Sequence, residues 1–394
     1  MRILLPFNKG ATHASFYTNF HAGIVEGVRE LGHEALIFGH EDIEQSSPAE
    51  QQALYRALTH QPCDAVFDLC CWAHCLSRST VWDGSSAGEP LFDSMEMDYV
   101  GLLYDHPWFQ PLPAVHSSRL YATVPDLSNT AQLALIYPEL ALRGTAFAPP
   151  AVDERNDRSG KGGARELPLL YIGNLHNEAL QRLWRDDPNA ALFDEVADRA
   201  LTEPELPLHE VLDLVLAAHG RDMEAGLALD VLRPVEYFRR TRFRLDAVRA
   251  AAASGVAMHV VGNGWEQAGL PGNVSLHPHV DYHALLDWVA RAQVCLDAST
   301  YPQGANDRVF NYMLNGAVTF TNARGFLGQV YGPQDGLQFY GLNEPGALAD
   351  ALREWVAAPA RMQEAAARAR ELTLATQTWR HRVEAILQML KAPA

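Results

Sequence analysis

A helix start, a cation and two amides come together in the segment Gly304–Asn322, which reads GANDRVFNYMLNGAVTFTN. Gly304 and Asn306 predict the end of a preceding strand and the cap of a helix that begins near Asp307. The first turn of a helix exposes unpaired N–H groups at the positive end of the helix dipole, so this turn favours an anion. Arg308 lies in that turn and can contact a phosphate with two nitrogen atoms.

Asn311 lies about one turn further along the predicted helix, on the same face as Asp307 and Arg308. Its amide can hydrogen-bond a ribose hydroxyl, so the segment predicts a nucleotide site in which Arg308 holds the phosphates. The same pattern also fits an ordinary helix–strand unit whose helix is well capped.

Titratable side chains follow an apolar run at Val100–Phe109, which reads VGLLYDHPWF. Asp105 or His106 can remove a proton from an acceptor group, and Pro107 and Trp108 suit the wall of a binding site. The alternative is a polar turn in which Asp105 is a local cap and Trp108 belongs to the core.

A second candidate base is His13, in the polar segment NKGATHAS at residues 8–15, directly after the first predicted strand. Lys9 in the same segment is a candidate binding residue, and a simple flexible loop is the alternative interpretation. Asp68, at the end of the third predicted strand, is a third candidate base.

Four potential metal ligands, Cys70, Cys71, His74 and Cys75, crowd together. Adjacent cysteines do not easily face one ion and no second ligand pair follows, so a buried strand end with small apolar thiols is the better interpretation. The sequence also has no Asp-x-Asp triplet of the kind that holds a divalent cation on a diphosphate. We therefore predict metal-independent chemistry, in which Arg308 and a helix start stabilise the phosphate charge.

Apolar strands that alternate with amphipathic helices position these residues, and the alternation occurs twice. Strands are predicted at residues 2–6, 34–38, 65–69, 99–104, 169–172, 258–261, 274–277, 294–296 and 318–321. Helices are predicted at residues 16–31, 282–292, 307–314 and 345–390, from near Pro48, and across a helix-rich stretch at 178–254 broken near Pro204, Pro207, Gly220 and Pro234. Residues 133–137 fit either a strand or a helical turn.

This alternation predicts an α/β protein with two parallel sheets covered by helices on both faces, in two Rossmann-like domains that face each other across a cleft. We expect a first domain at residues 1–152, a charged, glycine-rich linker at 153–167 and a second domain at 168–375. Residues 376–394 are expected to form a helix that returns to the first domain. Ligands of such sheets bind beyond the carboxyl ends of the strands, where the candidate residues lie.

The segment around Arg308 resembles the donor-binding segment of glycosyltransferases of the two-Rossmann-domain (GT-B) type, in the branch that includes spore-maturation-type glycosyltransferase-like proteins. In that family an Arg helps to hold the donor diphosphate, and a Glu three residues later bonds the donor ribose. The resemblance implies the phosphate role for Arg308. The Glu position is occupied by Asn311, which departs from the family pattern.

Three strand ends in the second half of the chain resemble further parts of the same family, in the same order. A glycine–asparagine pair follows two of the strands, and a histidine–valine pair stands where backbone groups usually meet the base. Together with the helix start, the resemblance implies the donor-binding residues Gly173, Asn174, Gly262, Asn263, His279, Val280, Asn306, Asp307, Arg308 and Asn311.

What the resemblance implies is a glycosyltransferase that moves a sugar from a UDP-, TDP- or GDP-linked donor to an acceptor which the sequence does not identify. The donor is then a substrate, and no other cofactor is expected. Many retaining relatives place a Lys after the first strand of the second domain, where this chain offers Arg182 and Arg185 only, and this favours inversion. Two alternatives share the architecture: a nucleotide-sugar 2-epimerase, and a nucleotide-sugar-binding protein without catalysis.

Composition argues against several other classes of function. A net charge of -17 over 394 residues argues against nucleic acid as the main partner and against docking on an anionic membrane. No run of about 18 apolar residues predicts a membrane span, and five cysteines without a secretory signal lead us to expect a cytoplasmic protein. The densest basic stretch fits either a solvated helix face or a contact to an acceptor or a phosphate, and comprises Arg233, Arg239, Arg240, Arg242, Arg244 and Arg249.

Overall fold

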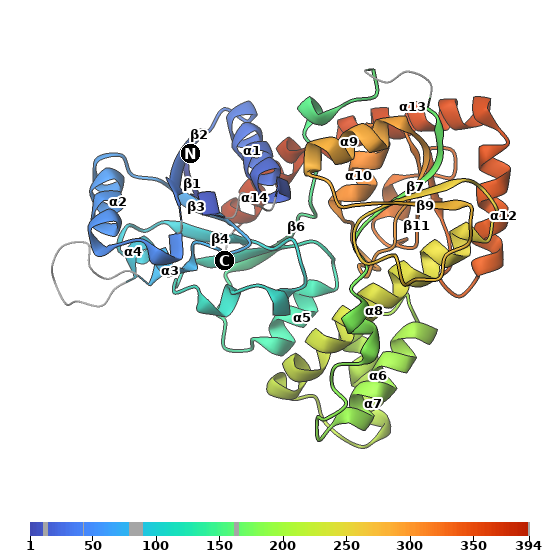
Figure 1. Ribbon diagram of the computed structural model, residues 1–394. Helices are drawn as coiled ribbons and strands as arrows, with labels where there is room; N and C mark the ends of the chain where they lie inside the picture. The colour runs from blue at the N-terminus through green and yellow to red at the C-terminus, as the bar shows by residue number, and fades with distance from the viewer. Residues whose placement is uncertain (11–14, 42, 79–89, 161–164, 393–394) are drawn as a thin grey trace. The chain divides into compact units, whose positions relative to one another are not determined.

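The computed structural model describes residues 1–10, 15–41, 43–78, 90–160 and 165–392, and the chain divides into two compact units. Unit 1 comprises residues 1–153 and 378–394, and unit 2 comprises residues 154–377. Each unit contains one six-stranded parallel sheet with helices packed on it (Figure 1). The predicted class, two Rossmann-like α/β sheets, is confirmed.

Unit 1 is built on a sheet in the order β2-β1-β3-β4-β5-β6. Its strands are β1 (Arg2–Asn8), β2 (Glu34–His40), β3 (Ala65–Leu69), β4 (Asp98–Leu102), β5 (Leu120–Val124) and β6 (Gly144–Phe147). Its helices are α1 (Ser15–Glu30), α2 (Pro48–His60), α3 (His74–Ser77), α4 (Leu91–Ser94), α5 (Asn129–Ile136) and α14 (Trp379–Lys391). After β2 the chain crosses to the other side of β1 to form β3, so the switch point of this sheet lies between β1 and β3.

The last helix, α14, packs on α1 within unit 1, as the sequence predicts. The Trp379 indole lies directly against the Cα of Gly23, so that any larger residue at this position of α1 would collide with it. The backbone N–H of Trp379 donates to the Val152 carbonyl at 3.2 Å, and Arg382 Nε donates to the Pro149 carbonyl at 2.8 Å. Close packing and two backbone anchors therefore fix the C-terminal helix on the N-terminal sheet.

Unit 2 is built on a sheet in the order β12-β11-β10-β7-β8-β9. Its strands are β7 (Leu167–Ile172), β8 (Met258–Val261), β9 (Val274–His277), β10 (Ala292–Leu296), β11 (Val318–Thr321) and β12 (Leu337–Phe339). Its helices are α6 (Ala190–Thr202), α7 (Leu208–Ala218), α8 (Ala225–Ala252), α9 (Tyr282–Arg291), α10 (Asp307–Leu314), α11 (Leu327–Val330), α12 (Pro345–Val356) and α13 (Pro359–Thr376). This is the strand order of dinucleotide-binding sheets, with the switch point between β7 and β10.

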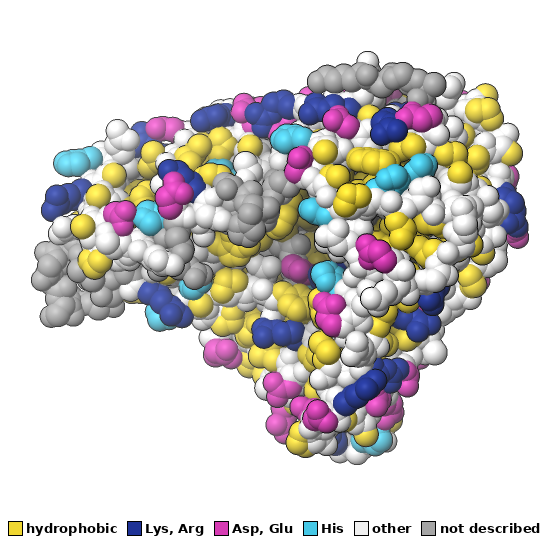
Figure 2. All heavy atoms as spheres, in the orientation of Figure 1, with side chains coloured by type: hydrophobic (Ala, Val, Ile, Leu, Met, Phe, Trp, Pro, Cys, Tyr) yellow, Lys and Arg dark blue, Asp and Glu magenta, His cyan; other side chains and the backbone are white. Residues whose placement is uncertain are grey.

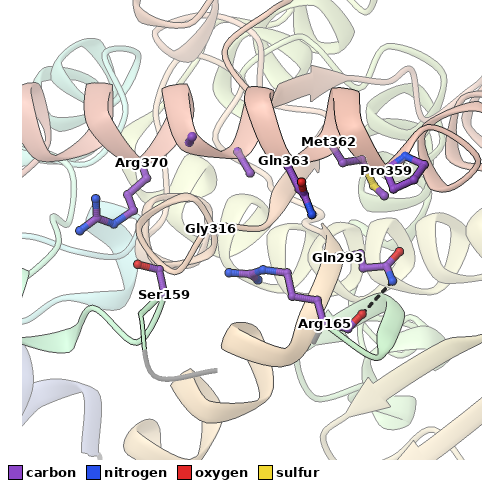
Figure 3. Close-up of a pocket in the computed structure, with 10 residues that line it drawn as sticks. Ser159, Arg165, Gln293, Gly316, Pro359, Met362, Gln363 and Arg370 are labelled. Carbon is purple, nitrogen blue, oxygen red and sulfur yellow. Dashed lines mark hydrogen bonds between the residues drawn. The ribbon is translucent and has the colours of Figure 1, made fainter. Parts of the chain in front are cut away.

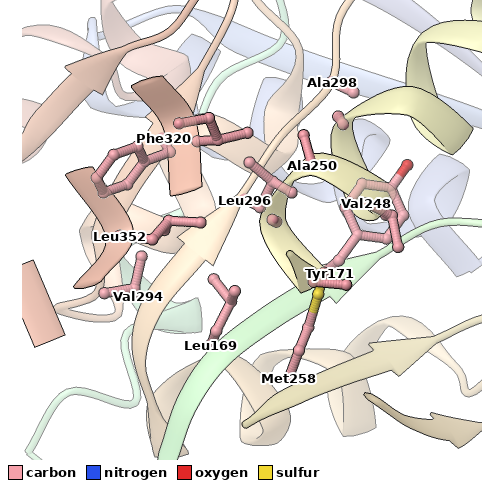
Figure 4. Close-up of a cluster of buried hydrophobic side chains, with 14 of the residues drawn as sticks. Leu169, Tyr171, Val248, Ala250, Met258, Val294, Leu296, Ala298, Phe320 and Leu352 are labelled. Carbon is pink, nitrogen blue, oxygen red and sulfur yellow. The ribbon is translucent and has the colours of Figure 1, made fainter. Parts of the chain in front are cut away.

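The core of unit 2 lies between the middle strands and the helices α8 and α12 (Figure 4). Leu169 from β7, Met258 from β8 and Leu296 from β10 are fully buried, and they meet Val248 and Leu352 from the two helices. Because successive residues of a buried parallel strand pack on both faces, the strand segments read as continuous apolar runs, which is why they are recognisable in the sequence.

Three strands and one long helix differ from the sequence prediction. The strands β5, β6 and β12 were not predicted, and the last two are only four and three residues long. Residues 133–136 form the last turn of a helix, α5, and Tyr137 is its C-cap. The predicted break at Pro234 is wrong, because α8 continues through it. Proline removes one helical hydrogen bond, and the burial of Val231, Val235 and Phe238 on either side offsets that loss.

The helices α6 and α7 and the start of α8 form a helical insert between β7 and β8 (Figure 1). Residues 186–230 of this insert contain twelve Asp and Glu residues against two Arg. Acidic side chains gather near its lower end on the surface shown in Figure 2. The negative charge of the chain is therefore concentrated on this insert. Among the described residues, no helix is long and apolar enough to cross a membrane.

Candidate functional site

Three loops at the carboxyl edge of the unit 2 sheet are joined by side chains that the sequence singled out. The Asn174 side-chain oxygen, after β7, accepts from the Asn263 N–H at 2.9 Å, after β8. The Asn263 side-chain oxygen in turn accepts from the His279 N–H at 3.1 Å, after β9. Two amides thus link the loops that follow three neighbouring strands.

Glycine is required where the first two of these loops approach each other. Gly262 has a φ of 148°, and a Cβ at this position would overlap the Gly173 carbonyl. That carbonyl accepts from Trp265 Nε1 at 2.7 Å, which fixes the Gly173 loop against the next segment. The close approach leaves backbone groups at the switch point of the sheet, as a nucleotide site requires.

Helix α10 begins with the cap that the sequence predicts. The Asn306 side-chain oxygen accepts from the Arg308 N–H at 3.0 Å and from the Val309 N–H at 3.4 Å. Asn306 Nδ2 also donates to Asp297 Oδ1 at 3.0 Å. Since the cap satisfies two of the first N–H groups of the helix, side chains must supply much of the contact to any anion bound there.

Asp297, directly after β10, is bonded to the cap of α10, to Arg308 and to β11, and its sequence position alone did not single it out. Its side chain is fully buried. Besides Asn306, it accepts from Arg308 Nη2 at 3.2 Å and from the Thr321 hydroxyl at 2.9 Å. The available signal was its position, because it ends the run VCLD at the carboxyl edge of a predicted strand, beside the switch point.

Arg308 is held by Asp297. Its side chain is 20% exposed, and its Nε is buried without a hydrogen-bond partner in the described part of the chain. Burial lowers the pKa of Arg308, but the surrounding acidic groups, Asp297 foremost, together outweigh burial and raise that pKa above its ordinary value. The pKa of the neighbouring Asp307 is raised, mainly by burial. Arg308 is therefore a fixed cation at the edge of the buried site.

The structure gives Asn311 internal partners. Its side chain is 1% exposed, and its oxygen accepts from the Tyr282 hydroxyl at 3.1 Å. Its Nδ2 donates to the Asp307 carbonyl one helical turn earlier, at 2.9 Å. The amide thus joins α10 to α9, and its predicted contact to a ribose stays a prediction. Val280, also expected at the donor, lies beside the core formed by β7, β8 and α9.

In unit 1, the predicted Asp105–His106 pair lies just beyond β4. The Asp105 carboxylate accepts from the His106 N–H at 2.8 Å, which is the local cap that the alternative interpretation describes. The His106 ring is 3% exposed and stacks on Trp108, with ring centroids 4.7 Å apart. Its Nδ1 lies 3.4 Å from Asn129 Nδ2, on α5. Asp105 is partly exposed and is the more accessible base of the two.

The other catalytic candidates in unit 1 differ in position. His13 lies outside the described residues. Asp68 is the last residue but one of β3 and is 1% exposed, and its carboxylate accepts from the Ala73 N–H at 3.0 Å and from the Tyr99 hydroxyl. Burial raises the pKa of Asp68 to about 7. Cys70 and Cys71 are buried beside it, and the described residues contain no cluster of His, Cys, Asp and Glu suited to a metal ion.

The described residues of unit 2 line a cavity at each of the two edges where its strands begin and end. The cavity in Figure 3, of about 480 Å³, lies where β7 and β10 begin, and its Arg165 donates to the carbonyls of Ala292 and Asn315 at 2.7 and 2.5 Å. That arginine therefore ties strand and helix ends together. A second cavity, of about 330 Å³, lies at the carboxyl edge, where Tyr340 joins it to the site by donating to the Asp297 carbonyl at 2.7 Å.

Residues 239–388 match a protein family described as glycosyl transferase-like. The matched region includes α10 and its cap, but it is less than half of the chain. No curated protein matches the chain in sequence.

Solved structures share the whole fold at low sequence identity. A sucrose-phosphate synthase from Thermosynechococcus elongatus is 11% identical with a TM-score of 0.57, covering 99% of this chain and 98% of the other. An α-glucosyltransferase solved with UDP is 11% identical with a TM-score of 0.56 over both complete chains. A glycosyltransferase from Rickettsia africae is 9% identical with a TM-score of 0.51, covering 100% of this chain and 99% of the other. The chain therefore has the GT-B fold.

Proposed function

We propose that this protein is a glycosyltransferase that binds a nucleotide-sugar donor at the carboxyl ends of β7 and β10 in unit 2. The observation that carries the proposal is the fixed cation Arg308, held by buried Asp297 at the switch point of the sheet. A switch point flanked by a glycine loop and a helix start is where sheets of this order bind nucleotides. Arg308 contacts the donor phosphates, and the loops of Gly173, Gly262 and His279 contact the rest of the nucleotide.

The comparisons support the same assignment. The glycosyl transferase-like match includes Arg308 and the loop of Gly262. Proteins with this fold were solved with UDP and with UDP-glucose, so UDP is the first nucleotide to test. One of them was solved with DNA as well. A net charge of -17 argues against DNA as the acceptor of this chain.

For the transfer step, we propose that unit 1 supplies the base. Asp105, partly exposed beyond β4, removes the acceptor proton, and His106 supports its position through the hydrogen bond between them. His13 is the second candidate for the base. The reaction inverts the anomeric centre. It uses no metal, because Arg308 neutralises the charge of the nucleoside diphosphate that leaves. The sugar is a hexose or a deoxyhexose.

A second candidate function is nucleotide-sugar binding without transfer. The observation that favours it is Asn311, whose amide is already engaged with Tyr282 and Asp307 where the family has a Glu. Donor hydrolysis or transfer by the purified protein separates the two functions, since a binding protein shows neither with any acceptor.

The test is thermal unfolding of the purified protein with UDP, GDP, TDP and their sugar conjugates, in the presence of EDTA. A ligand that binds only the folded state raises the melting temperature. We expect one nucleotide to stabilise the wild type and Arg308→Ala to lose most of that increase. If no nucleotide raises the melting temperature of the wild type, the proposed donor site is wrong.

Two further variants control this test. Arg308→Lys keeps a cation beside Asp297 and is expected to keep part of the increase, although lysine contacts a phosphate through one nitrogen only. Arg291→Ala removes an exposed arginine that pairs with Glu166 at 2.5 Å and is expected to keep the whole increase. The comparison is made on the ligand-induced increase, so that any change in the unliganded melting temperature cancels.

A further inference from the structure

A second arginine reaches the switch point of unit 2 from helix α8. Arg244 Nη1 donates to the Asn174 carbonyl at 2.9 Å, in the loop that follows β7. Its Nε is buried and has no hydrogen-bond partner among the residues that the structure describes. Burial lowers the pKa of Arg244, and the nearby positive charge of Arg308 lowers it further. The basic stretch of α8 is thus not only a solvated helix face.

The site around these arginines contains more positive than negative charge. Arg244 and Arg308 both act electrostatically on each other and on Asp297, whose carboxylate is bonded to Arg308. Asp307 adds little negative charge, because burial raises its pKa. A buried cation without a counter-ion is unfavourable, so the unliganded protein maintains a charge here that a bound anion would neutralise.

Unpaired donors occur at the same place. The hydroxyls of Tyr171, at the end of β7, and Tyr312, on α10, are buried without partners in the described part of the structure. Both lie close enough to Arg308 to affect its pKa when ionised, and the Nε of Arg308 is also unpaired among the described residues. Buried polar atoms are almost always hydrogen-bonded in folded proteins. Four unpaired donors beside an excess positive charge indicate an anionic ligand with several oxygen atoms.

We infer that Arg244 and Arg308 form a two-arginine clamp for both phosphates of a nucleoside diphosphate, and that Asp297 holds Arg308 in place until the diphosphate binds. The inference rests on the proposed donor site and adds a residue from outside its strand loops. When Arg308 turns to a phosphate, Asp297 keeps its hydrogen bonds from Asn306 and Thr321, so its charge stays partly compensated. A monophosphate can engage only one arginine well, and the site therefore selects diphosphates.

The test compares binding of UDP and UMP, or of the diphosphate and monophosphate of whichever nucleoside stabilises the protein, by isothermal titration calorimetry. We expect the wild type to bind the diphosphate at least about tenfold more tightly, as one additional charged hydrogen bond provides. Arg244→Met should abolish this preference and leave monophosphate affinity within about threefold. Its unliganded melting temperature should stay equal or rise, because a buried unpaired cation is replaced by an apolar side chain of similar length.

Arg249→Met is the matched control, since Arg249 also lies on α8 and donates to a backbone carbonyl, that of Ala268, at 2.8 Å. It should keep the diphosphate preference. An unchanged preference for the diphosphate in Arg244→Met would overturn the clamp. A lower unliganded melting temperature of this variant, together with equally weakened affinities for diphosphate and monophosphate, would also overturn it, because these changes indicate a structural role for Arg244.

Inorganic pyrophosphate separates this inference from the proposed function. If no nucleotide binds the wild type, the proposed function fails, and pyrophosphate then tests the clamp alone. Stabilisation of the wild type but not of Arg244→Met by pyrophosphate supports the clamp. Absence of stabilisation in both proteins overturns it.

Discussion

The carboxyl edges of the two sheets carry polar side chains of similar types, but these are used differently. In unit 2, Arg308 binds the buried carboxylate of Asp297, Arg244 binds the Asn174 carbonyl, and the Nε of each arginine is buried without a partner among the described residues. In unit 1, the Asp105 carboxylate caps the next residue, and the His106 ring is buried on Trp108. Among the described residues both edges retain buried polar atoms without partners, such as the Tyr104 hydroxyl and Asn129 Oδ1 in unit 1, but those of the first edge lie beside two arginines.

This difference separates binding from chemistry. A site that retains buried unpaired donors beside an excess of positive charge is less stable for it, and an anion that satisfies both explains it. The edge of unit 1, where Asp105 is partly exposed, is suited to presenting this one titratable group to a second substrate. Variants on the two edges should therefore affect different measured quantities.

The largest expected effect comes from unit 1. Asp105→Asn removes the proposed base and keeps the side-chain volume, so kcat of sugar transfer should fall by about 10²- to 10⁴-fold while the dissociation constant of the nucleotide stays unchanged. Steady-state kinetics with a saturating donor, together with calorimetry, measures both. His106→Gln is the companion variant, and a larger loss there would transfer the role of base to His106.

The next effect is on the stability of unit 2. Asp297→Asn keeps the shape of the side chain but leaves Arg308 without its counter-ion, which should cost about 3 kcal/mol of unfolding free energy. Urea denaturation followed by tryptophan fluorescence measures it. Glu166→Gln, which breaks the exposed pair with Arg291, should leave the denaturation midpoint where it is. Equal midpoints for both variants would show that Asp297 is not a buried counter-ion.

A backbone variant tests the loop contact on the same edge. Gly262→Ala introduces a Cβ that overlaps the Gly173 carbonyl at a φ of 148°, so we expect a loss of about 2 kcal/mol and of nucleotide binding. Gly272→Ala meets no atom within 4 Å and should change neither. Thermal unfolding with and without nucleotide distinguishes the two. Normal binding by Gly262→Ala would exclude this loop from the donor site.

The last effect is a gradual change of stability with pH, and it concerns a buried acid of unit 1. The pKa of Asp68 is raised to about 7 by burial, whereas the unfolded chain has a value near 3.8. Between these values the native state holds the proton more tightly, so stability falls as pH rises from about 4 to about 7. Asp68→Asn should flatten this dependence by up to about 1 kcal/mol per pH unit. Denaturation midpoints at pH 5, 6 and 7 measure it, and parallel curves would contradict the prediction.

Most of the fold was predictable from local patterns. The strands β3, β8, β9 and β11 were located to the residue, because each is a short apolar run bounded by polar or glycine-containing segments. The strands β6 and β12 were missed, since three or four residues carry too little pattern to separate a strand from a loop. The break expected at Pro234 did not occur, because burial along α8 outweighed the preference of one residue.

The candidate site was predictable in part. Gly262 and Asn306 are identified by residue type at a strand end or helix start, since backbone geometry and capping depend on local sequence. Asp297 was not identified, and Arg244 was named only as one of six arginines in a basic stretch, because each matters through a partner that is distant in sequence. Arg244 lies 64 positions before Arg308, and only the fold brings it to the loop that follows β7, where it binds the Asn174 carbonyl.

The sequence by itself determined two α/β sheets and a capped helix with a cation in its first turn, because periodicity and caps are local properties. The tertiary structure decided which charges meet. It brought Arg308 to Asp297 and Arg244 to the loop of Asn174, while it enclosed Asn311 between two helices. Parallel strands place their carboxyl ends at one edge whatever their separation in the chain, so the charge balance of that edge exists only in the folded protein.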